Sequence, residues 1–273
     1  MVVATFTVLA DLVAQVAGPQ VQVTSIVGPG MNVHGYEPSP DDLRRVAEAD
    51  LVFANGLGLE TRLTDLVTPL GVPIVVLSDG IEPLPIHGSA AETGGLAHNP
   101  HAWMSPRAGR AYVAAVVDAL AAADPAGAAG YAERGDALAA ELSGIETELA
   151  GRLASVPAER RVLVTCEGAF SYLVRDLGLR EAYLWPVNSE RQGTPRQVAS
   201  VIDTVREAGV PAVFCESTIA PTAALQVARE TGARFGGELY VDSLSAPDGP
   251  APSYLALLRH DADLIVAAMT GPT

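Results

Sequence analysis

Short apolar runs alternate with amphipathic stretches in the first part of the chain. Four of these runs predict buried strands, because they are rich in β-branched residues and are followed by turn-forming residues. They are Val2–Thr7, Gln22–Val27, Leu51–Asn55 and Pro73–Leu77. The segment Ser39-Pro40-Asp41-Asp42-Leu43 predicts the start of a helix, since it offers an N-cap serine, a proline at the first helical position and acids in the first turn. Alternation of this kind predicts a mainly parallel sheet with helices on both faces.

The middle of the chain has a helical period instead. Ser105-Pro106 predicts a helix that runs to about Ala123. Beyond it, apolar residues recur at heptad-like spacing from about Ala126 to Ser155, which predicts a helix of about 30 residues and about 45 Å. The residues that carry this spacing are Tyr131, Leu138, Leu142, Ile145, Leu149 and Leu153.

Strand–helix alternation resumes after this helix. Four further runs predict strands, and Thr194-Pro195 and Ala220-Pro221 each predict the start of a helix between them. The runs are Arg161–Cys166, Ala182–Trp185, Ala212–Glu216 and Gly237–Asp242. The whole pattern predicts an α/β protein of two lobes joined by one long helix. The first lobe is expected at residues 1–125, the joining helix at 126–156 and the second lobe at 157–273.

The composition narrows the class of protein. A chain of 273 residues, of which 49% are hydrophobic, can bury a large core in one or two domains. It carries 17 Lys and Arg against 32 Asp and Glu, and the formal charge of −15 would repel a phosphate backbone or an anionic membrane. Nucleic acid is therefore excluded as a partner.

The chain has no apolar run of the roughly 20 residues that a membrane-spanning helix needs. Its opening, MVVATFTVLADLVAQVAG, lacks the basic segment and the small-residue cleavage site of a signal peptide. We therefore expect a soluble chain that is either cytosolic or a mature exported form supplied with a start methionine.

Two cysteines, Cys166 and Cys215, each end an apolar run of strand type. They can form a disulfide if the two strands are neighbours, and they are buried thiols otherwise. Because cysteine is among the most often buried residue types, the thiol interpretation is preferred.

Candidate chemistry lies at the ends of predicted strands and comprises two histidines and two acids. Open parallel sheets bind ligands at the carboxyl ends of their strands, so metal-competent side chains there are candidate ligands. The four candidates are His34, His101, Glu167 and Asp242. Each alone is a weak signal, because a loop histidine is more often solvated or hydrogen-bonded than metal-bound. Together, in a cleft between two lobes, they predict a metal site.

This set would offer a divalent ion two imidazole nitrogens and up to four carboxylate oxygens. Such donors suit Mn²⁺ or Fe²⁺, and two carboxylates cancel the charge of the ion, so that burying the complex costs less. The lack of a cysteine ligand disfavours a structural zinc site, although zinc accepts histidine and carboxylate ligands. The predicted ion is therefore Mn²⁺ or Fe²⁺, with Zn²⁺ as the remaining alternative.

The motifs around these residues resemble those of the metal-binding solute receptors of manganese, iron and zinc ABC transporters. His34 with Gly35-Tyr36-Glu37-Pro38 is similar to the first ligand loop of that family, and Asn99-Pro100-His101-Ala102-Trp103 is similar to the second. Thr165-Cys166-Glu167-Gly168-Ala169-Phe170 matches the third, with Glu167 where zinc-specific members usually carry histidine. Glu238-Leu239-Tyr240-Val241-Asp242-Ser243-Leu244 matches the fourth and includes the ligand Asp242. The resemblance covers essentially the whole chain.

The resemblance also implies an architecture and a role. It implies two lobes, each a four-stranded, mainly parallel sheet with flanking helices, around a rigid helix. It implies a monomeric receptor, not an enzyme, that lies in the periplasm or is tethered to the outer surface and delivers metal to a membrane permease. Tyr183-Leu184-Trp185-Pro186-Val187-Asn188 is most similar to the branch that serves manganese and iron uptake in Gram-negative bacteria. The zinc branch carries a histidine-rich loop, whereas residues 80–99 here contain only His87 and His98.

Several polar residues near these motifs keep two interpretations. Glu37 and Glu216 either accept a ring N–H from a ligand histidine, or cap a helix or pair with an arginine. His98 is either an auxiliary ligand or, as preferred, a solvent-facing loop residue. His87 and His260 have no evident partner and are expected at the surface.

Two other classes of protein remain alternatives. Two histidines and a carboxylate form the facial triad of non-haem iron enzymes, so a metalloenzyme that uses this site is the main one. Against it, a fourth ligand would close the coordination sphere, and the chain has neither an HExxH nor a GxSxG motif. The second is an adhesin-like surface protein that binds metal incidentally, which no motif supports.

Overall fold

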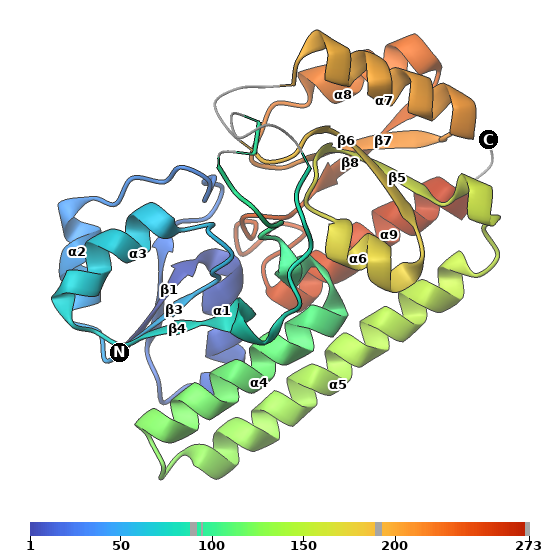
Figure 1. The fold of residues 1–273 in the computed structure, drawn as a ribbon. Coiled ribbons are helices and arrows are strands. Elements are labelled where there is room, and N and C mark those ends of the chain that lie inside the picture. Colours follow the sequence, from blue (N-terminus) through green and yellow to red (C-terminus); the bar gives the residue numbers. More distant parts are fainter. Residues whose placement is uncertain (88–91, 94, 189–192, 271–273) are drawn as a thin grey trace.

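The first lobe is built on one parallel sheet. The structure, a computed structural model, describes residues 1–87, 92–93, 95–188 and 193–270. The strand order is β2-β1-β3-β4, with every neighbouring pair parallel, and Figure 1 shows this sheet among the helices of the blue end of the chain. Its strands are β1 (Val2–Phe6), β2 (Val23–Val27), β3 (Leu51–Ala54) and β4 (Ile74–Val76). The predicted strands are therefore present here.

Helices follow these strands, as the alternation predicts. The capping signal at Ser39 is real: its hydroxyl accepts the Asp42 N–H, and the Asp42 carboxylate accepts the Ser39 N–H. The reciprocal pair satisfies backbone groups that the first turn leaves free, so α2 begins at Pro40. The helical segments of this lobe are α1 (Thr7–Ala17), α2 (Pro40–Ala47) and α3 (Thr61–Val67), with 3₁₀ turns η1 (Thr68–Leu70), η2 (Leu77–Gly80) and η3 (Ala102–Met104).

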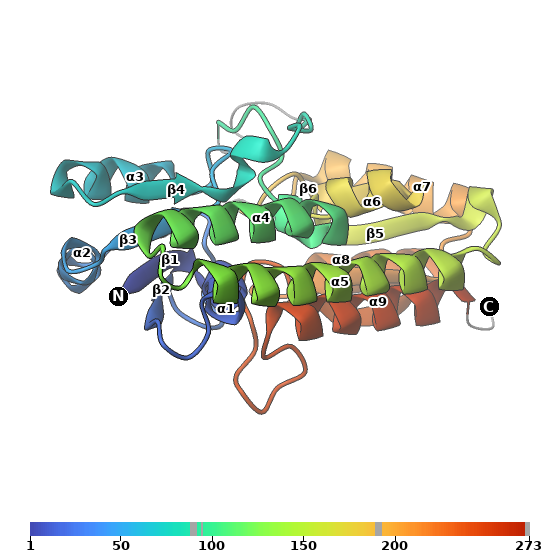
Figure 2. The same cartoon turned by 90° about the horizontal axis from the view of Figure 1, so that it is seen from below.

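A helical hairpin runs along both lobes. α4 (Pro106–Ala123) is capped by Ser105, whose hydroxyl accepts the Ala108 N–H, and α5 (Ala128–Leu153) follows it. α5 packs against α1, α4 and α9 (Tyr254–Thr270), and Figure 2 shows it running between α4 and α9 from the first lobe to the second. Its buried face consists of the residues of the predicted heptad spacing together with Gly135. The lobe boundaries at residues 125 and 157 stay a prediction.

The second lobe carries two parallel strand pairs. β5 pairs with β6 and β7 pairs with β8, and β5 and β7 are neighbours between the two pairs. The α/β fold with parallel strands is confirmed, but the hydrogen-bonded ladder in this lobe is split into two two-stranded parts. Its elements are η4 (Ala158–Arg160), β5 (Val162–Glu167), α6 (Ser171–Leu177), β6 (Arg180–Trp185), α7 (Pro195–Ala208), β7 (Ala212–Glu216), α8 (Thr222–Thr231), β8 (Arg234–Leu239) and α9.

A disulfide joins the two strand pairs. Cys166 of β5 is bonded to Cys215 of β7, with their Cα atoms 4.8 Å apart. The preferred interpretation of buried thiols is therefore wrong, because the two strands are neighbours. One residue further along, the Glu216 carboxylate accepts the Glu167 backbone N–H at 3.1 and 3.2 Å. At this point the backbone N–H of β5 is hydrogen-bonded by a side chain and not by a backbone carbonyl of β7.

β8 begins earlier than the sequence predicts. It runs from Arg234 to Leu239 and not over Gly237–Asp242. Gly236 lies within the strand, and only glycine fits there because the Phe214 ring occupies the space that a side chain would need. The ladder with β7 is irregular beside Phe214. The strand thus includes both Gly236 and Gly237, and Asp242 lies just past its end.

One hydrophobic core extends through both lobes. It takes buried residues from β1 and α1, from α4 and α5, and from β5, α6 and α9. Within it, the Tyr254 hydroxyl donates to the Trp103 main-chain oxygen at 2.5 Å, and the Trp103 indole N–H donates to the Val241 oxygen at 3.1 Å. Because packed interiors tolerate few voids, turning one lobe against the other would have to disrupt this core.

Candidate metal centre

The four predicted ligands meet at one point between the lobes. Their donor atoms all lie within 4.8 Å of one another. His34 Nε2 is 3.0 Å from His101 Nε2 and 3.2 Å from Glu167 Oε1. The Asp242 Oδ1 atom is 3.7 Å from His34 Nε2 and 3.8 Å from His101 Nε2. The structure therefore brings all four side chains together, while their role as metal ligands stays a prediction.

Each lobe supplies one kind of donor. His34 lies in the loop between β2 and α2, and His101 immediately precedes η3, so both imidazoles belong to the first lobe. Glu167 is the last residue of β5, and Asp242 follows β8, so both carboxylates belong to the second. Loops and strand ends at the carboxyl edge of parallel strands are where α/β proteins place ligand-binding groups.

The His34 loop is held in place from both lobes. The Asn32 side-chain oxygen accepts the His34 backbone N–H at 2.8 Å. Across the interlobe boundary, the Gly30 N–H donates to the Ser243 hydroxyl at 2.6 Å, one residue after Asp242. Gly30 has a φ of 74°, in the region that favours glycine. The loop that carries one imidazole is thereby tied to the segment that carries one carboxylate.

Asn99 fixes the orientation of the His101 ring. Its side-chain amide nitrogen donates to the Gly168 oxygen at 2.6 Å and to the Ser171 hydroxyl at 3.0 Å. Its oxygen therefore faces His101, where it accepts the backbone N–H at 3.0 Å and contacts Nδ1 at 2.9 Å. With the proton on Nδ1, Nε2 keeps a free lone pair towards the other donors, which is the arrangement that a metal-binding imidazole needs.

The buried Glu60 carboxylate supports the segment that carries His101, and it does so through Asn55. Glu60 accepts the Thr5 hydroxyl and the Asn55 N–H, each at 2.7 Å, and burial raises its pKa. The Asn55 side chain in turn donates to the Pro100 oxygen at 3.0 Å, directly before His101. Glu60 thus fixes Asn55, and Asn55 in turn fixes the backbone directly before His101.

Both oxygens of Glu167 are hydrogen-bonded by Asn188. The Asn188 backbone N–H donates to Oε1 at 2.6 Å, and the side-chain amide donates to Oε2 at 2.7 Å. The same amide lies 3.5 Å from Asp242 Oδ2. Asp242 Oδ1, which points towards the histidines, finds no hydrogen-bond donor among the residues that the structure describes. A buried, unpaired carboxylate oxygen of this kind fits a cation as its missing partner.

The charges in the cluster are strongly coupled. Burial lowers the pKa of His34, but the Glu167 and Asp242 carboxylates more than offset this and raise it to about 9. Burial alone would raise the pKa of Glu167, yet the two histidines hold it well below its usual range. Burial and the neighbouring Glu167 raise the pKa of Asp242. Without an ion, the carboxylates thus compensate their charge by keeping a proton on His34.

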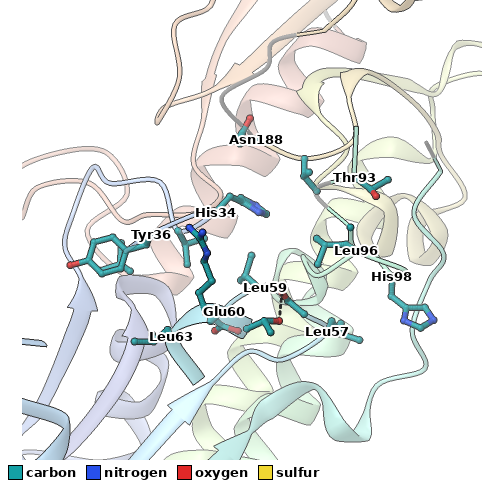
Figure 3. Close-up of a pocket in the computed structure, with 18 of the residues that line it drawn as sticks. His34, Tyr36, Leu57, Leu59, Glu60, Leu63, Thr93, Leu96, His98 and Asn188 are labelled. Carbon is teal, nitrogen blue, oxygen red and sulfur yellow. Dashed lines mark hydrogen bonds between the residues drawn. The ribbon is translucent and has the colours of Figure 1, made fainter. Parts of the chain in front are cut away.

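A cavity of about 1230 Å³ opens beside the cluster. His34 and Asn188 line it, and Figure 3 shows His34 between Asn188 on one side and Glu60 on the other. The side chains of His101, Glu167 and Asp242 are completely buried, whereas the His34 side chain keeps 8% of its surface exposed. An ion would therefore reach the donors from the cavity, past His34.

Other polar residues fall outside the cluster. Glu37 is exposed and pairs with Arg62 at 2.9 Å, so it does not support a ligand histidine. Glu216 is buried and accepts a backbone N–H of Glu167, not a ring N–H. His98 lines the cavity from an exposed position. Sequence reasoning missed Asn188 and Glu60, because an uncharged amide and a helix-preceding acid carry no metal-binding signal by themselves.

The sequence is similar over nearly its whole length to proteins named for metal binding. It matches the family described as Zinc-uptake complex component A periplasmic over residues 2–268. It is 45% identical to the iron-binding protein YfeA of Yersinia pestis, over 97% of this chain and 84% of that protein. It is 33% identical to the manganese-binding lipoprotein MntA of Halalkalibacterium halodurans, over 98% of this chain and 88% of that protein.

Solved structures share the fold. The Mn-bound periplasmic metal binding protein from Candidatus Liberibacter asiaticus superposes with a TM-score of 0.91 at 36% identity, over 98% of both chains. The periplasmic zinc binding protein TroA from Treponema pallidum superposes with a TM-score of 0.89 at 27% identity, again over 98% of both chains. The relatives therefore span proteins named for iron, manganese and zinc.

Proposed function

Because the chain belongs to the family of periplasmic zinc-uptake complex component A proteins, we propose that it is the solute-binding component of an ABC importer. It captures one divalent transition-metal ion between its lobes and delivers it to a membrane permease. The observation that carries this proposal is the convergence of two imidazole nitrogens and two carboxylate oxygens, from His34, His101, Glu167 and Asp242, within 4.8 Å of one another.

The donor set favours Mn²⁺ or Fe²⁺ as the ion, with Zn²⁺ as the remaining candidate. Two nitrogens and up to four oxygens can satisfy an ion that prefers six ligands, whereas zinc commonly takes four. Two carboxylates also neutralise a divalent ion, and burial is tolerable only for such a neutral complex. Relatives named for manganese and for iron are compatible with this choice.

Capture involves local movement more than lobe rotation. The shared core and α5 couple the two lobes, and a continuous packed helix resists bending better than a pair of hinge strands. The His34 loop lies at the cavity side of the cluster and includes Gly30 and Gly35, both with positive φ. Breaking the Gly30–Ser243 hydrogen bond would release this loop, which is the part that moves to admit and release the ion.

The site of action is the periplasm or the outer surface of the cell. Relatives of the chain are named as periplasmic proteins or as lipoproteins. Among the described residues, no helix has the length and hydrophobicity to cross a bilayer. The chain acts as a monomer that docks on the permease. A metalloenzyme is the weaker alternative, since the family consists of transport components.

The proposal is tested by titrating metal-stripped protein with Mn²⁺, Fe²⁺ and Zn²⁺ in a calorimeter, after elemental analysis of the protein as purified. One ion per chain is expected for each metal that binds. The Glu167→His variant should shift the preference towards Zn²⁺, because a third imidazole replaces a carboxylate that can offer two oxygens. Failure of the unmodified protein to bind any of the three ions would refute the proposed function.

A further inference from the structure

Asn188 contacts both carboxylates of the cluster and donates a hydrogen bond to each oxygen of Glu167. We propose that it is a positioning residue that fixes how Glu167 and Asp242 present their oxygens, and that it thereby sets the preference of the site for Mn²⁺ over Zn²⁺. This inference rests on the proposed function of metal capture. Asn188 is itself buried, at 1% exposure, and is one of the residues labelled beside His34 in Figure 3.

The orientation of the Asn188 amide is not free. The Trp185 indole N–H, at the end of β6, donates to Asn188 Oδ1 at 2.8 Å. An indole N–H can only donate, so it must face the oxygen of the amide. The NH₂ group is thereby turned towards the two carboxylates, and a flipped amide would lose three favourable contacts at once.

That NH₂ group bridges the outer oxygens of both acids. It lies 2.7 Å from Glu167 Oε2 and 3.5 Å from Asp242 Oδ2. The inner oxygens, Glu167 Oε1 and Asp242 Oδ1, face the imidazoles. A single amide therefore holds two like charges side by side, in a buried place where their repulsion is poorly screened.

The grip on Glu167 fixes the plane of its carboxylate. The backbone N–H of Asn188 holds Oε1 and its side chain holds Oε2, so rotation of the carboxylate would break one bond or the other. Each carboxylate oxygen has two lone pairs, so a hydrogen bond leaves one lone pair for an ion. The fixed plane thus decides whether Oε2, as well as Oε1, can coordinate the ion.

The fixed orientation of the Glu167 carboxylate matters more to Mn²⁺ than to Zn²⁺. Zinc binds nitrogen and oxygen donors more tightly than manganese does, so a site favours manganese only through geometry and ligand number. A four-coordinate zinc ion needs one oxygen from each acid and tolerates a rotated carboxylate. An ion with higher coordination needs the second oxygens as well. Loss of Asn188 should therefore cost Mn²⁺ affinity more than Zn²⁺ affinity.

The test compares the affinities for Mn²⁺ and Zn²⁺ of the unmodified protein and the variants Asn188→Leu and Trp185→Phe. Leucine has the same branched arrangement of side-chain heavy atoms as asparagine, but it is larger and can neither donate nor accept a hydrogen bond. We expect Asn188→Leu to weaken Mn²⁺ binding about 10- to 100-fold, the range usual for a supporting residue, and Zn²⁺ binding by less than about tenfold. Trp185→Phe keeps the amide but frees its orientation, and should shift the ratio in the same direction by less.

A second readout separates positioning from a general loss of structure. X-ray absorption at the manganese edge should report fewer oxygen ligands in Asn188→Leu than in the unmodified protein, and the metal-free melting temperatures monitor folding. Equal losses for both ions, or an unchanged ratio in both variants, would overturn the inference while leaving metal capture intact. If Asn188→Leu does not fold, the ratio in Trp185→Phe decides. Binding of neither ion by the unmodified protein would instead defeat the proposed function.

Discussion

Among the four proposed ligands, Asp242 is the one whose environment calls most clearly for a cation. Its Oδ1 atom is buried and lacks a hydrogen-bond donor among the described residues, and the Glu167 carboxylate lies in the same cluster. Burial and that neighbour raise its pKa. Protonated His34 and Asn188 compensate this charge only in part, and a cation would supply the missing partner of Oδ1.

Replacing Asp242 by alanine should separate binding from stability. We expect the affinity for Mn²⁺ to fall by more than about 100-fold, beyond the usual effect of a supporting residue. The melting temperature of the metal-free protein should change little, because removal of a buried charge offsets the loss of its attraction to protonated His34. Asp41→Ala is the matched control, since Asp41 is an exposed acid of α2. Unchanged Mn²⁺ affinity in Asp242→Ala would show that this residue is not a ligand.

The proton on His34 competes with the ion. Its pKa of about 9 in the metal-free fold exceeds the value of about 6.5 expected for an unfolded chain. The protonated His34 ring therefore contributes its full stabilisation to the metal-free protein below pH 6.5 or so. This stabilisation is lost as the pH rises through about 9. Metal needs the neutral ring, so metal affinity should rise with pH over the same window.

Calorimetry in two buffers of different ionisation enthalpy measures this exchange directly. At pH 7.5 or so, Mn²⁺ binding should release about one proton per ion from His34, because the metal-free ring is protonated there. A binding enthalpy that is the same in both buffers would mean that His34 is already neutral, and the coupling between His34 and the two acids would be wrong.

At the scale of single residues, the sequence predicts the donors but not what holds them. His34, His101, Glu167 and Asp242 are titratable residues near predicted strand ends, which is a recognisable signal. Asn188 and Glu60 act through contacts with residues far away in the chain. Asn188 contacts Glu167 from 21 positions away, and Glu60 contacts Thr5 from 55 positions away. Such contacts depend on the finished fold, and no local pattern encodes them.

At the scale of elements, the contact between β5 and β7 differs most from the prediction, because a disulfide joins these strands where a continuous sheet and buried thiols were expected. The Cys166–Cys215 bond closes a chain segment with a sequence separation of 49. Closing such a segment in the unfolded chain is expected to stabilise the fold by about 4 kcal/mol. The double variant Cys166→Ala/Cys215→Ala should lose about that much unfolding free energy in urea titrations of the metal-free protein.

Mn²⁺ binding by the double variant shows whether loss of the disulfide disturbs the metal site or only lowers the stability of the fold. Asn188 and Glu216 hold Glu167 independently of the disulfide, so the double variant should still bind one Mn²⁺ ion per chain. An unfolding free energy equal to that of the unmodified protein would mean that the disulfide does not constrain the unfolded chain.

The glycines of α5 offer a second test at this scale. A side chain at Gly144 would meet open space, whereas one at Gly135 would meet the Val117 side chain of α4. Gly144→Ala should therefore stabilise the protein by about 0.5–1 kcal/mol through helix propensity alone. Gly135→Ala should destabilise it by about 1–3 kcal/mol, since it overpacks the contact between α4 and α5. Urea unfolding of the pair measures both, and equal effects of the same sign would contradict the packing.

Element boundaries are predicted well where caps or β-branched runs mark them, and poorly where packing decides. α2, α4 and α7 begin at the prolines that their capping residues indicate. The start of β8 is predicted at Gly237, whereas the strand begins at Arg234, because Gly236, which the Phe214 ring requires, has no side chain and gives no strand signal. The disulfide was missed because spacing along the chain does not reveal which strands are neighbours.

At the scale of the whole molecule, the two lobes follow from the interruption of strand–helix alternation by a long helical period. The sequence does not reveal that one core runs through both lobes. This continuity predicts a small response to the ion. Spin labels at the exposed positions Glu48 of the first lobe and Glu207 of the second should change their separation by less than about 2 Å when Mn²⁺ is added. A larger change would mean that the lobes rotate despite the shared core.

Anomalous diffraction at the manganese edge, from crystals grown with Mn²⁺, tests the central claim most directly. A single strong peak is expected between the lobes, within about 2.5 Å of His34 Nε2, His101 Nε2, Glu167 and Asp242. A peak elsewhere on the molecule, or one that touches only one lobe, would contradict the account.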